Sequence, residues 1–378
     1  MASNPFTPSF GVSPPLLVGR DAELEAVAES LDGGPGSPAR ATLFTGVRGC
    51  GKTALLNAVE DLARNRGWLV VSETVRPGVA QRIADTHLTA LLAQHTDEAV
   101  RRRLTQASAS VFGVGGGVTR HHEDRHPVAA SLRSRLDELT EAIAPRGSGV
   151  LISLDEVHRS AITDLRELAH TVQHAFREGR EVALVAAGLP SAVTDLLNDD
   201  VLTFLRRAER FTLGKVPASD VARALREPIE SSGRAIGDDA LSLAVEGTQR
   251  YPFLVQLVGF HSWRADPGST EVTAEHVREG IERSVRRVGH LVHEPALSSL
   301  SAVDKSFLAA MAVDDGPSAM GVIAQRLGVD ATYASQYRLR LIAAELIEPV
   351  GHGKVDFTLP YVRDYLREHA ATEALGPL

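Results

Sequence analysis

Short apolar runs alternate with amphipathic segments over the first half of the chain. The runs cover residues 41–45, 68–73, 149–156, 181–188 and 210–213, and most of them are rich in Val, Leu, Ile and Ala. Apolar runs of about four to eight residues, bounded by glycine, proline or charged residues, are typical of buried strands in a parallel sheet. The segments between them carry apolar residues at helical spacing. The alternation predicts an α/β fold, with a parallel sheet between layers of helices.

Helical spacing dominates the next part of the chain. Apolar positions recur three or four residues apart in the segments 220–225, 238–246, 251–263 and 273–288. Each of these helices would have one face to bury against its neighbours. We therefore expect a helical domain over residues 216–292.

A different pattern begins near residue 297. Helical patterns over 302–313, 322–328 and 332–346 are followed by two short strand patterns within 347–359, around a Gly-His-Gly turn. A helix, a turn, a second helix and a hairpin resemble a winged helix-turn-helix domain. Its third helix would expose Tyr333, Gln336, Tyr337, Arg338 and Arg340. Its wing would expose His352 and Lys354.

One glycine-rich segment joins the first strand run to a helical pattern, and it reads Gly46-Val47-Arg48-Gly49-Cys50-Gly51-Lys52-Thr53. The spacing G-x-x-x-x-G-K-T between a strand and a helix is that of a phosphate-binding loop. Glycines let several backbone N–H groups face one anion, and the helix N-terminus adds the positive end of its dipole. We expect this segment and Ala54 to bind ATP or ADP, with Lys52 reaching the β- and γ-phosphates and the Thr53 hydroxyl binding Mg²⁺. A chance glycine-rich turn is the alternative, and the flanking strand and helix disfavour it.

A pair of acidic residues, Asp155-Glu156, ends the apolar run 149–156. At the carboxyl end of a buried parallel strand, these side chains would lie beside the phosphate-binding loop. Asp155 would then hold Mg²⁺, and Glu156 would be the base that polarises the attacking water. Acid pairs also occur by chance at strand ends, but this pair follows a complete phosphate-binding loop.

Charge restricts what the C-terminal segment can bind. The 378-residue chain has a net charge of −8, so any contact with nucleic acid needs a local basic patch. Residues 301–378 carry seven Lys or Arg and ten Asp or Glu, a net charge of −3. Because a surface that follows phosphates is normally basic, this balance weakens a DNA-binding interpretation and leaves protein docking as the alternative.

The single cysteine and the chain start are consistent with a cytoplasmic protein. Cys50 is the only cysteine, so no intrachain disulfide can form, and we interpret it as a tolerated small residue with a redox switch as the alternative. No apolar run approaches the roughly 18 residues that span a bilayer. Residues 1–18 are broken by prolines and do not resemble a signal peptide. We expect a helix over 97–109, and in 113–126 a polar loop whose histidines are solvated rather than metal-binding.

These motifs together resemble AAA-type ATPases of the replication-initiator kind, in a bacterial branch of that family. The resemblance runs from about Leu17 to Leu366 and adds the segment Val18-Gly19-Arg20, followed by Asp21 as a helix N-cap. It implies a P-loop sheet with an additional strand and a catalytic glutamate, a helical lid and a winged helix. It also implies that Val18, Gly19 and Arg20 lie near the adenine, although an ordinary capped surface helix would have the same sequence.

The resemblance further implies polar sensors for the γ-phosphate. The strand 181–188 ends in Ala187-Gly188, where that family has a polar residue, so Ser191 is the nearest polar candidate and slow turnover is expected. Arg206 or Arg207 would be an arginine finger for a neighbouring subunit in a homo-oligomer, and Arg250 a second sensor in the lid. A solvated arginine at a helix end is the alternative for Arg206 and Arg207.

The expected organisation is an arm at 1–18, an ATPase base at 19–215, a helical lid at 216–292 and a winged helix at 296–378. The leading hypothesis is an ATP-hydrolysing switch that couples nucleotide state to double-stranded DNA through Tyr333, Gln336, Arg338, Arg340 and Lys354. A regulatory ATPase whose winged helix docks a protein is the alternative. A nucleotide-sensing scaffold without useful turnover is the third interpretation.

Overall fold

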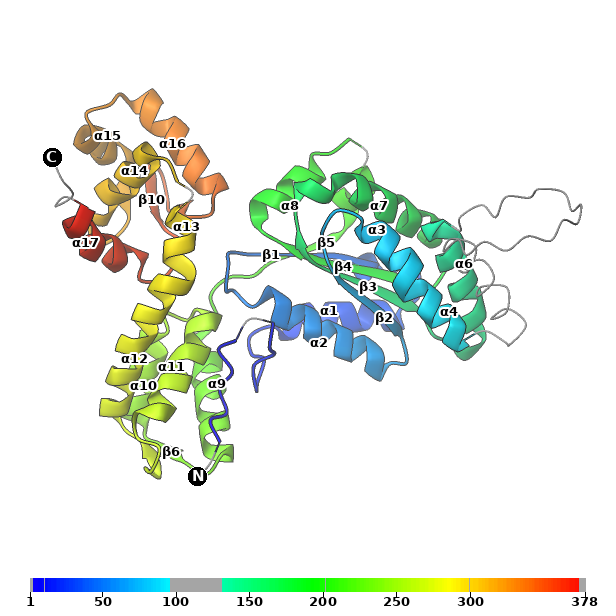
Figure 1. The fold of residues 1–378 in the computed structure, drawn as a ribbon, viewed down its shortest axis with the longest axis horizontal. Helices are drawn as coiled ribbons and strands as arrows, with labels where there is room; N and C mark the ends of the chain where they lie inside the picture. The colour runs from blue at the N-terminus through cyan, green and yellow to red at the C-terminus, as the bar shows by residue number, and fades with distance from the viewer. Residues whose placement is uncertain (1–2, 10, 96–130, 201, 299, 374–378) are drawn as a thin grey trace, which may run out of the picture.

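A five-stranded parallel sheet is the centre of the N-terminal half of the protein (Figure 1). The computed structural model describes residues 3–9, 11–95, 131–200, 202–298 and 300–373. The strands follow the order β2 (Leu69–Thr74), β3 (Val150–Val157), β4 (Val182–Gly188), β1 (Ala41–Thr45) and β5 (Glu209–Thr212). All four neighbouring pairs are parallel, which confirms the predicted P-loop type of α/β fold.

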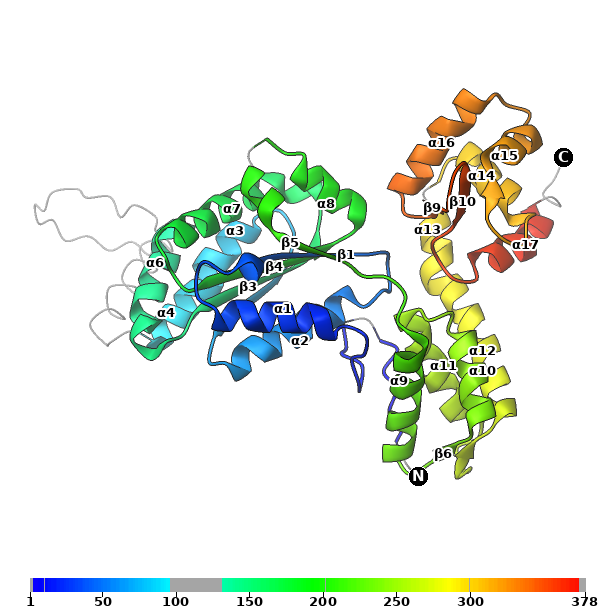
Figure 2. The same cartoon turned by 180° about the vertical axis from the view of Figure 1, so that it is seen from behind.

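Helices cover both faces of this sheet, as Figures 1 and 2 show from opposite sides. One layer consists of α1 (Asp21–Asp32) and α2 (Lys52–Asn65), and its core includes Val27, Leu55, Phe44 and Val185. The helices of the other layer are α3 (Val79–Arg82), α4 (Thr89–His95), α6 (Leu132–Ile143), α7 (Ile162–Arg177) and α8 (Pro190–Leu197). Successive residues of a strand point to opposite faces, so Leu43 contributes to one core and Phe44 to the other.

Short helical turns complete this part of the chain. They are η1 (Pro38–Arg40), η2 (Ile83–Leu88), η3 (Ala144–Arg146), η4 (Arg159–Ala161) and η5 (Thr203–Arg207). The expected helix at 97–109 and the loop at 113–126 lie outside the described residues. Asp21 is the first helical residue of α1 rather than its N-cap, and Arg20 at the cap position makes no capping hydrogen bond through its side chain.

The strand order explains how the two sequence motifs meet. Strand β4 lies between β1 and β3, whereas β2, which comes between them in the sequence, lies at the edge of the sheet. Since parallel strands all end at one edge, the loop after β1 and the acidic end of β3 share the carboxyl edge. One inserted strand separates the two motifs.

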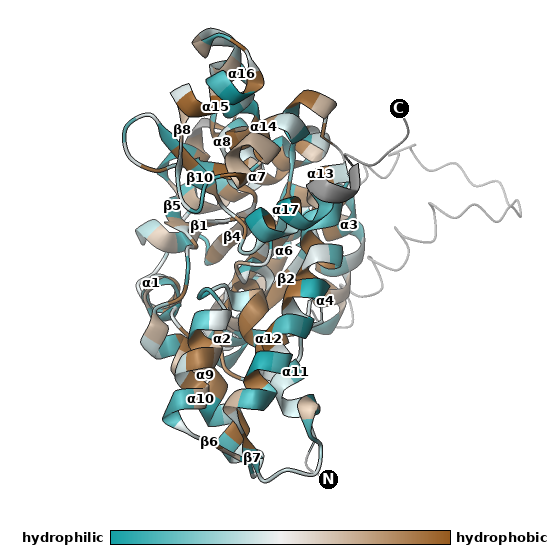
Figure 3. Cartoon of the chain, turned by 90° about the vertical axis from the view of Figure 1, so that its left-hand side faces the viewer, coloured by the Kyte–Doolittle hydropathy of each residue, from teal (hydrophilic) through white to brown (hydrophobic). Residues whose placement is uncertain are grey.

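The segment predicted to be a lid, which keeps that name below, is a bundle of amphipathic helices. It consists of α9 (Ala218–Ser231), α10 (Asp238–Gly247), α11 (Pro252–Ala265) and α12 (Ala274–Val288), with the two-stranded sheet β6 (Ala235–Ile236) and β7 (Glu271–Val272). Hydrophobic and hydrophilic segments alternate along α9 and α12 (Figure 3). The chain continues from α12 through η6 (Gly289–His293) and α13 (Glu294–Ser298) toward the C-terminal unit (Figure 1).

The C-terminal unit combines four helices with a small antiparallel sheet. Its elements are α14 (Ala302–Ala312), β8 (Ser318–Ala319), α15 (Met320–Leu327), α16 (Ala331–Ala343), β9 (Ile347–Pro349), β10 (Lys354–Phe357) and α17 (Val362–Glu373). The sheet order is β8-β10-β9, so it has a third strand that the sequence pattern did not predict. Asp330 caps α16 by accepting a hydrogen bond from the backbone N–H of Tyr333, at 2.7 Å.

The N-terminal arm packs against the lid rather than extending into solvent. Phe6 is 2% exposed and contributes to the lid core with Val221 and Val258. The amide of Asn4 donates to the carbonyl of Phe260, at 3.0 Å. No helix in the described ranges has both the length and the apolar character needed to cross a membrane.

Candidate nucleotide site

The glycine-rich loop lies between the end of β1 and the start of α2. Its backbone needs two left-handed residues, Gly49 with φ 74° and Gly51 with φ 93°, conformations that residues with a Cβ rarely adopt. Helix α2 begins at Lys52 and runs for 14 residues. The free N–H groups of its first turn therefore face the loop, where they and the helix dipole favour an anion.

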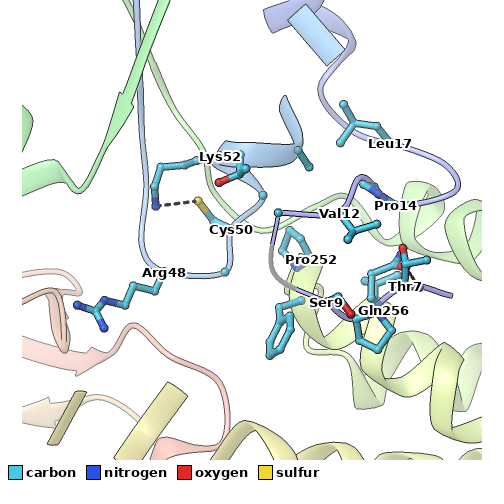
Figure 4. Close-up of a pocket in the computed structure, with 18 of the residues that line it drawn as sticks. Thr7, Ser9, Val12, Pro14, Leu17, Arg48, Cys50, Lys52, Pro252 and Gln256 are labelled. Atoms are coloured by element: carbon cyan, nitrogen blue, oxygen red, sulfur yellow. Dashed lines mark hydrogen bonds between the residues drawn. The ribbon is translucent and has the colours of Figure 1, made fainter. Parts of the chain in front are cut away.

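The amino group of Lys52 lies within the curl of this loop. Its Nζ donates to the carbonyl oxygens of Gly46, at 2.6 Å, and Val47, at 2.9 Å. The same group lies 3.9 Å from the Cys50 sulfur, and Figure 4 shows the two side by side. In this conformation the Lys52 ammonium is held by carbonyls of the loop itself, and its binding of phosphate stays a prediction.

Thr53 and Asp155 meet directly, although they are 102 positions apart. The Thr53 hydroxyl donates to Oδ2 of Asp155 at 2.6 Å, and Oδ1 of Asp155 accepts from the backbone N–H of Glu156 at 2.8 Å. A hydroxyl and a carboxylate from facing elements are hard oxygen ligands, the kind that Mg²⁺ takes together with substrate phosphates. The residues present therefore fit a magnesium ion bound with a nucleotide.

Glu156 has an unusual backbone conformation beside this pair. Its φ is 55°, and the pairing of β3 with β4 shifts register between Leu154 and Val157. A left-handed non-glycine residue costs on the order of 1 kcal/mol, and such strain concentrates at functional sites. The bulge leaves the Glu156 side chain exposed on the wall of the cavity that contains Thr53 and Asp155.

A cavity of about 630 Å³ extends from these groups to the N-terminal arm. The end beside the glycine-rich loop is lined by Arg48 to Ala54, Asp155 and Glu156, and the end opposite is largely apolar. The apolar end is lined by Thr7, Pro8, Val12, Pro14, Leu17, Val18, Pro252, Val255 and Gln256. Figure 4 shows the arm residues crossing in front of Pro252 and Gln256 of α11. An adenosine group fits an apolar end of this kind.

Of the three residues expected near the adenine, Val18 and Arg20 line the cavity. Arg20 is 6% exposed, and its guanidinium donates to the carbonyls of Cys50 (3.2 Å) and Gly214 (2.9 Å). Arg20 therefore ties the phosphate-binding loop to the segment after β5. Gly19 has φ 63° and lies against Val216, outside the cavity lining.

The lid holds the loop from the other side, a contact that the loop motif could not reveal. The buried Tyr251 hydroxyl donates to the carbonyl of Arg48, and the Phe253 N–H donates to the carbonyl of Gly49 at 3.3 Å. Any side chain at Gly49 would collide with the Tyr251 ring. Burial raises the pKa of the Tyr251 hydroxyl, so it remains a proton donor to this carbonyl.

Cys50 is buried under the loop, with its side chain in the core that α1 and α2 form with the sheet. Burial raises the pKa of its thiol, and this outweighs the opposing charges of Lys52 and Arg20. A buried thiol with a raised pKa reacts slowly, because the thiolate is the reactive form. The structure therefore favours the packing role over a redox switch.

The two candidates for an arginine finger, Arg206 and Arg207, and the candidate second sensor, Arg250, lie away from the cavity. Arg206 and Arg207 are exposed on η5, and Nε of Arg206 donates to the carbonyl of Leu197 at 2.8 Å. Arg250 is exposed with φ 61°, at the turn before α11. None of the three lines the cavity in this conformation of the described chain. Ser191, the expected sensor substitute, instead donates through both its N–H and its hydroxyl to Glu345.

Comparison with known families assigns two segments of the chain. Residues 16–185 match a family described as an AAA ATPase domain, and residues 290–366 match a domain of unknown function, DUF8462. No curated protein matches the sequence.

Several solved structures are similar in fold. The Walker-type ATPase PABY2304 of Pyrococcus abyssi has a TM-score of 0.64 and 16% identity, with 93% of this chain and 96% of that chain covered. The RuvB Holliday junction branch migration motor of Thermotoga maritima has a TM-score of 0.47 and 14% identity, with 93% of this chain and 95% of that chain covered. Cdc6p from Pyrobaculum aerophilum has a TM-score of 0.47 and 16% identity, with 97% of each chain covered. At these identities the likeness concerns the fold, and the first structure alone of these three scores above 0.5. The family match, the sheet order and the loop geometry together support a P-loop ATPase domain of the AAA type at residues 16–185.

Proposed function

We propose that the protein is an ATP-binding and ATP-hydrolysing switch whose C-terminal unit is the output. The observation that carries the proposal is the contact between Thr53 and Asp155 at the mouth of the phosphate-binding loop. Lys52 would bind the β- and γ-phosphates, and Thr53 and Asp155 would hold Mg²⁺. Bound Mg²⁺ would neutralise the charge that develops on the phosphates. Glu156 would accept a proton from the attacking water.

The lid and the C-terminal unit are connected to the loop by packing. Tyr251, Leu254 and Leu257 of the lid share one hydrophobic core with Phe307 of the C-terminal unit, and Val47 of the loop packs against it. A change at the loop would therefore act on both units through direct contacts. This arrangement supports nucleotide control of their position.

The test of the enzymatic assignment is a phosphate-release assay on Glu156→Gln. The substitution keeps the size of the side chain and removes the base, so we expect ATP binding to persist while turnover falls by roughly 100-fold or more. Glu167→Gln on the outer layer is a matched control with the same loss of charge. Turnover of Glu156→Gln equal to that of the wild-type protein would contradict the assignment.

Arg206 and Arg207 are candidates for action across a subunit boundary. Both side chains are exposed and neither lines the cavity of its own chain, which is compatible with a role at a neighbour's γ-phosphate in a homo-oligomer. Arg250 would reach the phosphates only after the lid moves. ATPase activity per protomer that rises steeply with protein concentration would support the trans role, and activity independent of concentration would contradict it.

Double-stranded DNA is the first candidate for the output ligand. A winged helix would present Gln336 and Arg338 on α16 and Lys354 on β10 to the duplex. Four of the seven basic residues of this unit are however engaged in ion pairs within it, namely Arg326, Arg340, Arg363 and Arg367. Arg340 donates to the buried Asp304 at 2.8 Å. Its guanidinium is therefore engaged within the unit and would have to leave this ion pair to bind DNA.

A protein partner is the second candidate, and the distribution of exposed apolar side chains favours it. Among the large hydrophobic side chains that are exposed in the described chain, most belong to the C-terminal unit, namely Val313, Val322, Tyr333, Leu339 and Val350. Leu339 is 62% exposed on α16, on the helix that would face DNA. Apolar exposure combined with a net negative charge suits a protein surface better than a phosphate backbone.

Duplex binding at low salt separates the two candidates. If DNA is the ligand, the affinity should fall steeply with salt, and Arg338→Ala/Lys354→Ala should weaken binding and reduce the salt slope. Lys215→Ala, on the segment after β5, is the control outside this unit. If the ligand is a protein, no duplex binds at low salt, and Leu339→Ser affects partner capture only.

A further inference from the structure

A carboxylate from the C-terminal unit reaches the base of the ATPase domain. Glu345 follows the end of α16, and its Oε1 lies 3.3 Å from both the N–H and the hydroxyl oxygen of Ser191. Ser191 is the second residue of α8, directly after the end of β4. In Figure 1 the C-terminal end of α16 points toward α8 across the space between the two units.

The backbone at Glu345 is held in a strained conformation that presents this side chain. Its φ is 61°, where glycine or asparagine is the usual choice after a helix. The hydroxyl of Thr358 donates to the Glu345 carbonyl, and the Glu345 N–H donates to the carbonyl of Ile342 at 2.9 Å. A glycine would relieve the strain, so the glutamate costs folding energy while it provides the contact with Ser191.

The carboxylate is bound beside the wall of the cavity, through Ser191, although neither residue lines the cavity itself. Gly188 and Leu189, which precede Ser191, line that cavity together with Lys52 and Arg48. Burial raises the pKa of the Glu345 carboxyl, while the hydrogen bonds from Ser191 and the charges of Lys52 and Arg48 lower it. Figure 4 shows the Arg48 side chain extending from the loop toward the C-terminal segment.

We propose that Glu345 is a specificity-determining residue of the nucleotide site: the conformation in which Glu345 contacts Ser191 prefers a nucleoside diphosphate to a triphosphate. The inference rests on the proposed function, because it requires that Lys52 bind phosphates. A γ-phosphate bound by Lys52 would bring further negative charge to a region where the charges of Lys52 and Arg48 already act on the Glu345 carboxylate. Like charges repel, so a triphosphate would bind only with loss of the Ser191 contact or of its own affinity. ADP lacks that charge and leaves the contact intact.

The experiment measures the dissociation constants of ADP and of a non-hydrolysable ATP analogue, each with Mg²⁺, by calorimetry at pH 8. We expect Glu345→Gln to raise analogue affinity relative to ADP by roughly ten-fold, since a charged hydrogen bond and one repulsion are removed. Glu348→Gln is the matched control, because Glu348 is an exposed acid three positions away on β9. An affinity ratio in Glu345→Gln equal to that in Glu348→Gln would overturn the inference.

A second variant distinguishes loss of the carboxylate from a loss of stability. Glu345→Gly removes the carboxylate and suits the left-handed backbone, so it should keep the thermal stability of the C-terminal unit and shift the ratio as Glu345→Gln does. An unchanged ratio in both variants contradicts the role of Glu345 and leaves the proposed function intact. Failure of the wild-type protein to bind either nucleotide contradicts the proposed function itself.

Discussion

At the scale of single residues, Gly49 is the point where loop and lid constrain each other. Its left-handed backbone shapes the phosphate-binding loop, and the space that a Cβ would take is filled by the Tyr251 ring. The carbonyls on either side of this position, of Arg48 and Gly49, accept hydrogen bonds from Tyr251 and Phe253. The same glycine therefore allows both the anion-binding curl and its contact with the lid.

The Gly49→Ala variant tests whether the contact with Tyr251 supports the loop, beyond the effect of backbone strain. The variant adds about 1–2 kcal/mol of left-handed strain and displaces Tyr251, so we expect nucleotide affinity to fall at least ten-fold. Gly67→Ala is the matched control, because Gly67 has φ 77° and no atom within 4 Å of the added Cβ. Equal nucleotide affinities of the two variants in a calorimetric titration would show that the contact with Tyr251 does not support the loop.

At the scale of elements, the segment η6 joins the lid to the C-terminal unit through a buried histidine. Nε2 of His293 donates to the carbonyl of Pro360 at 2.9 Å, and its ring packs edge-on against Tyr365. His293 is fully buried, and this burial lowers its pKa to about 4 despite the hydrogen bond to Pro360. The joint between the two units is therefore built around a neutral imidazole.

This joint should weaken as the pH falls. The unfolded chain binds the proton at the ordinary histidine pKa of about 6.5 and the folded chain only near 4, so stability is full above pH 6.5 and is lost as the pH drops toward 4. Between pH 7 and pH 5 the loss should be about 2 kcal/mol in the free energy of unfolding. Denaturant titrations of wild-type protein and His293→Gln measure it, and the variant should lose this contribution.

The neighbouring His290 provides the control for that measurement. It lies on the same segment and is exposed, so His290→Gln should retain the pH dependence of the wild-type protein. A pH profile of His293→Gln that coincides with that of His290→Gln would contradict the assignment of the joint to His293.

At the scale of the whole molecule, the parts that the sequence predicted are those encoded by local patterns. Lys52, Thr53 and Asp155 could be predicted because the motif fixes the loop and parallel strands bring their carboxyl ends to one edge. The contacts of Tyr251 and Glu345 could not, because each joins segments about 150 or more positions apart and neither carries a recognisable motif.

The N-terminal arm was predicted as extended but not as a wall of the cavity. Its prolines indicate an extended backbone, whereas the burial of Phe6 depends on the space that the lid leaves beside Gly259. The parallel sheet was predicted from apolar runs, but the place of β4 inside it depends on pairing between distant strands. Lid, arm and loop therefore enclose one cavity that only the tertiary structure reveals.

The most direct test of the central claim is the affinity for MgATP of wild-type protein and of Lys52→Ala, measured by calorimetry. If the loop binds the triphosphate, the wild-type protein binds MgATP, and Lys52→Ala shows no measurable binding while Lys215→Ala, an exposed lysine outside the cavity, binds normally. Binding of MgATP by Lys52→Ala as tight as that of the wild-type protein would contradict the account.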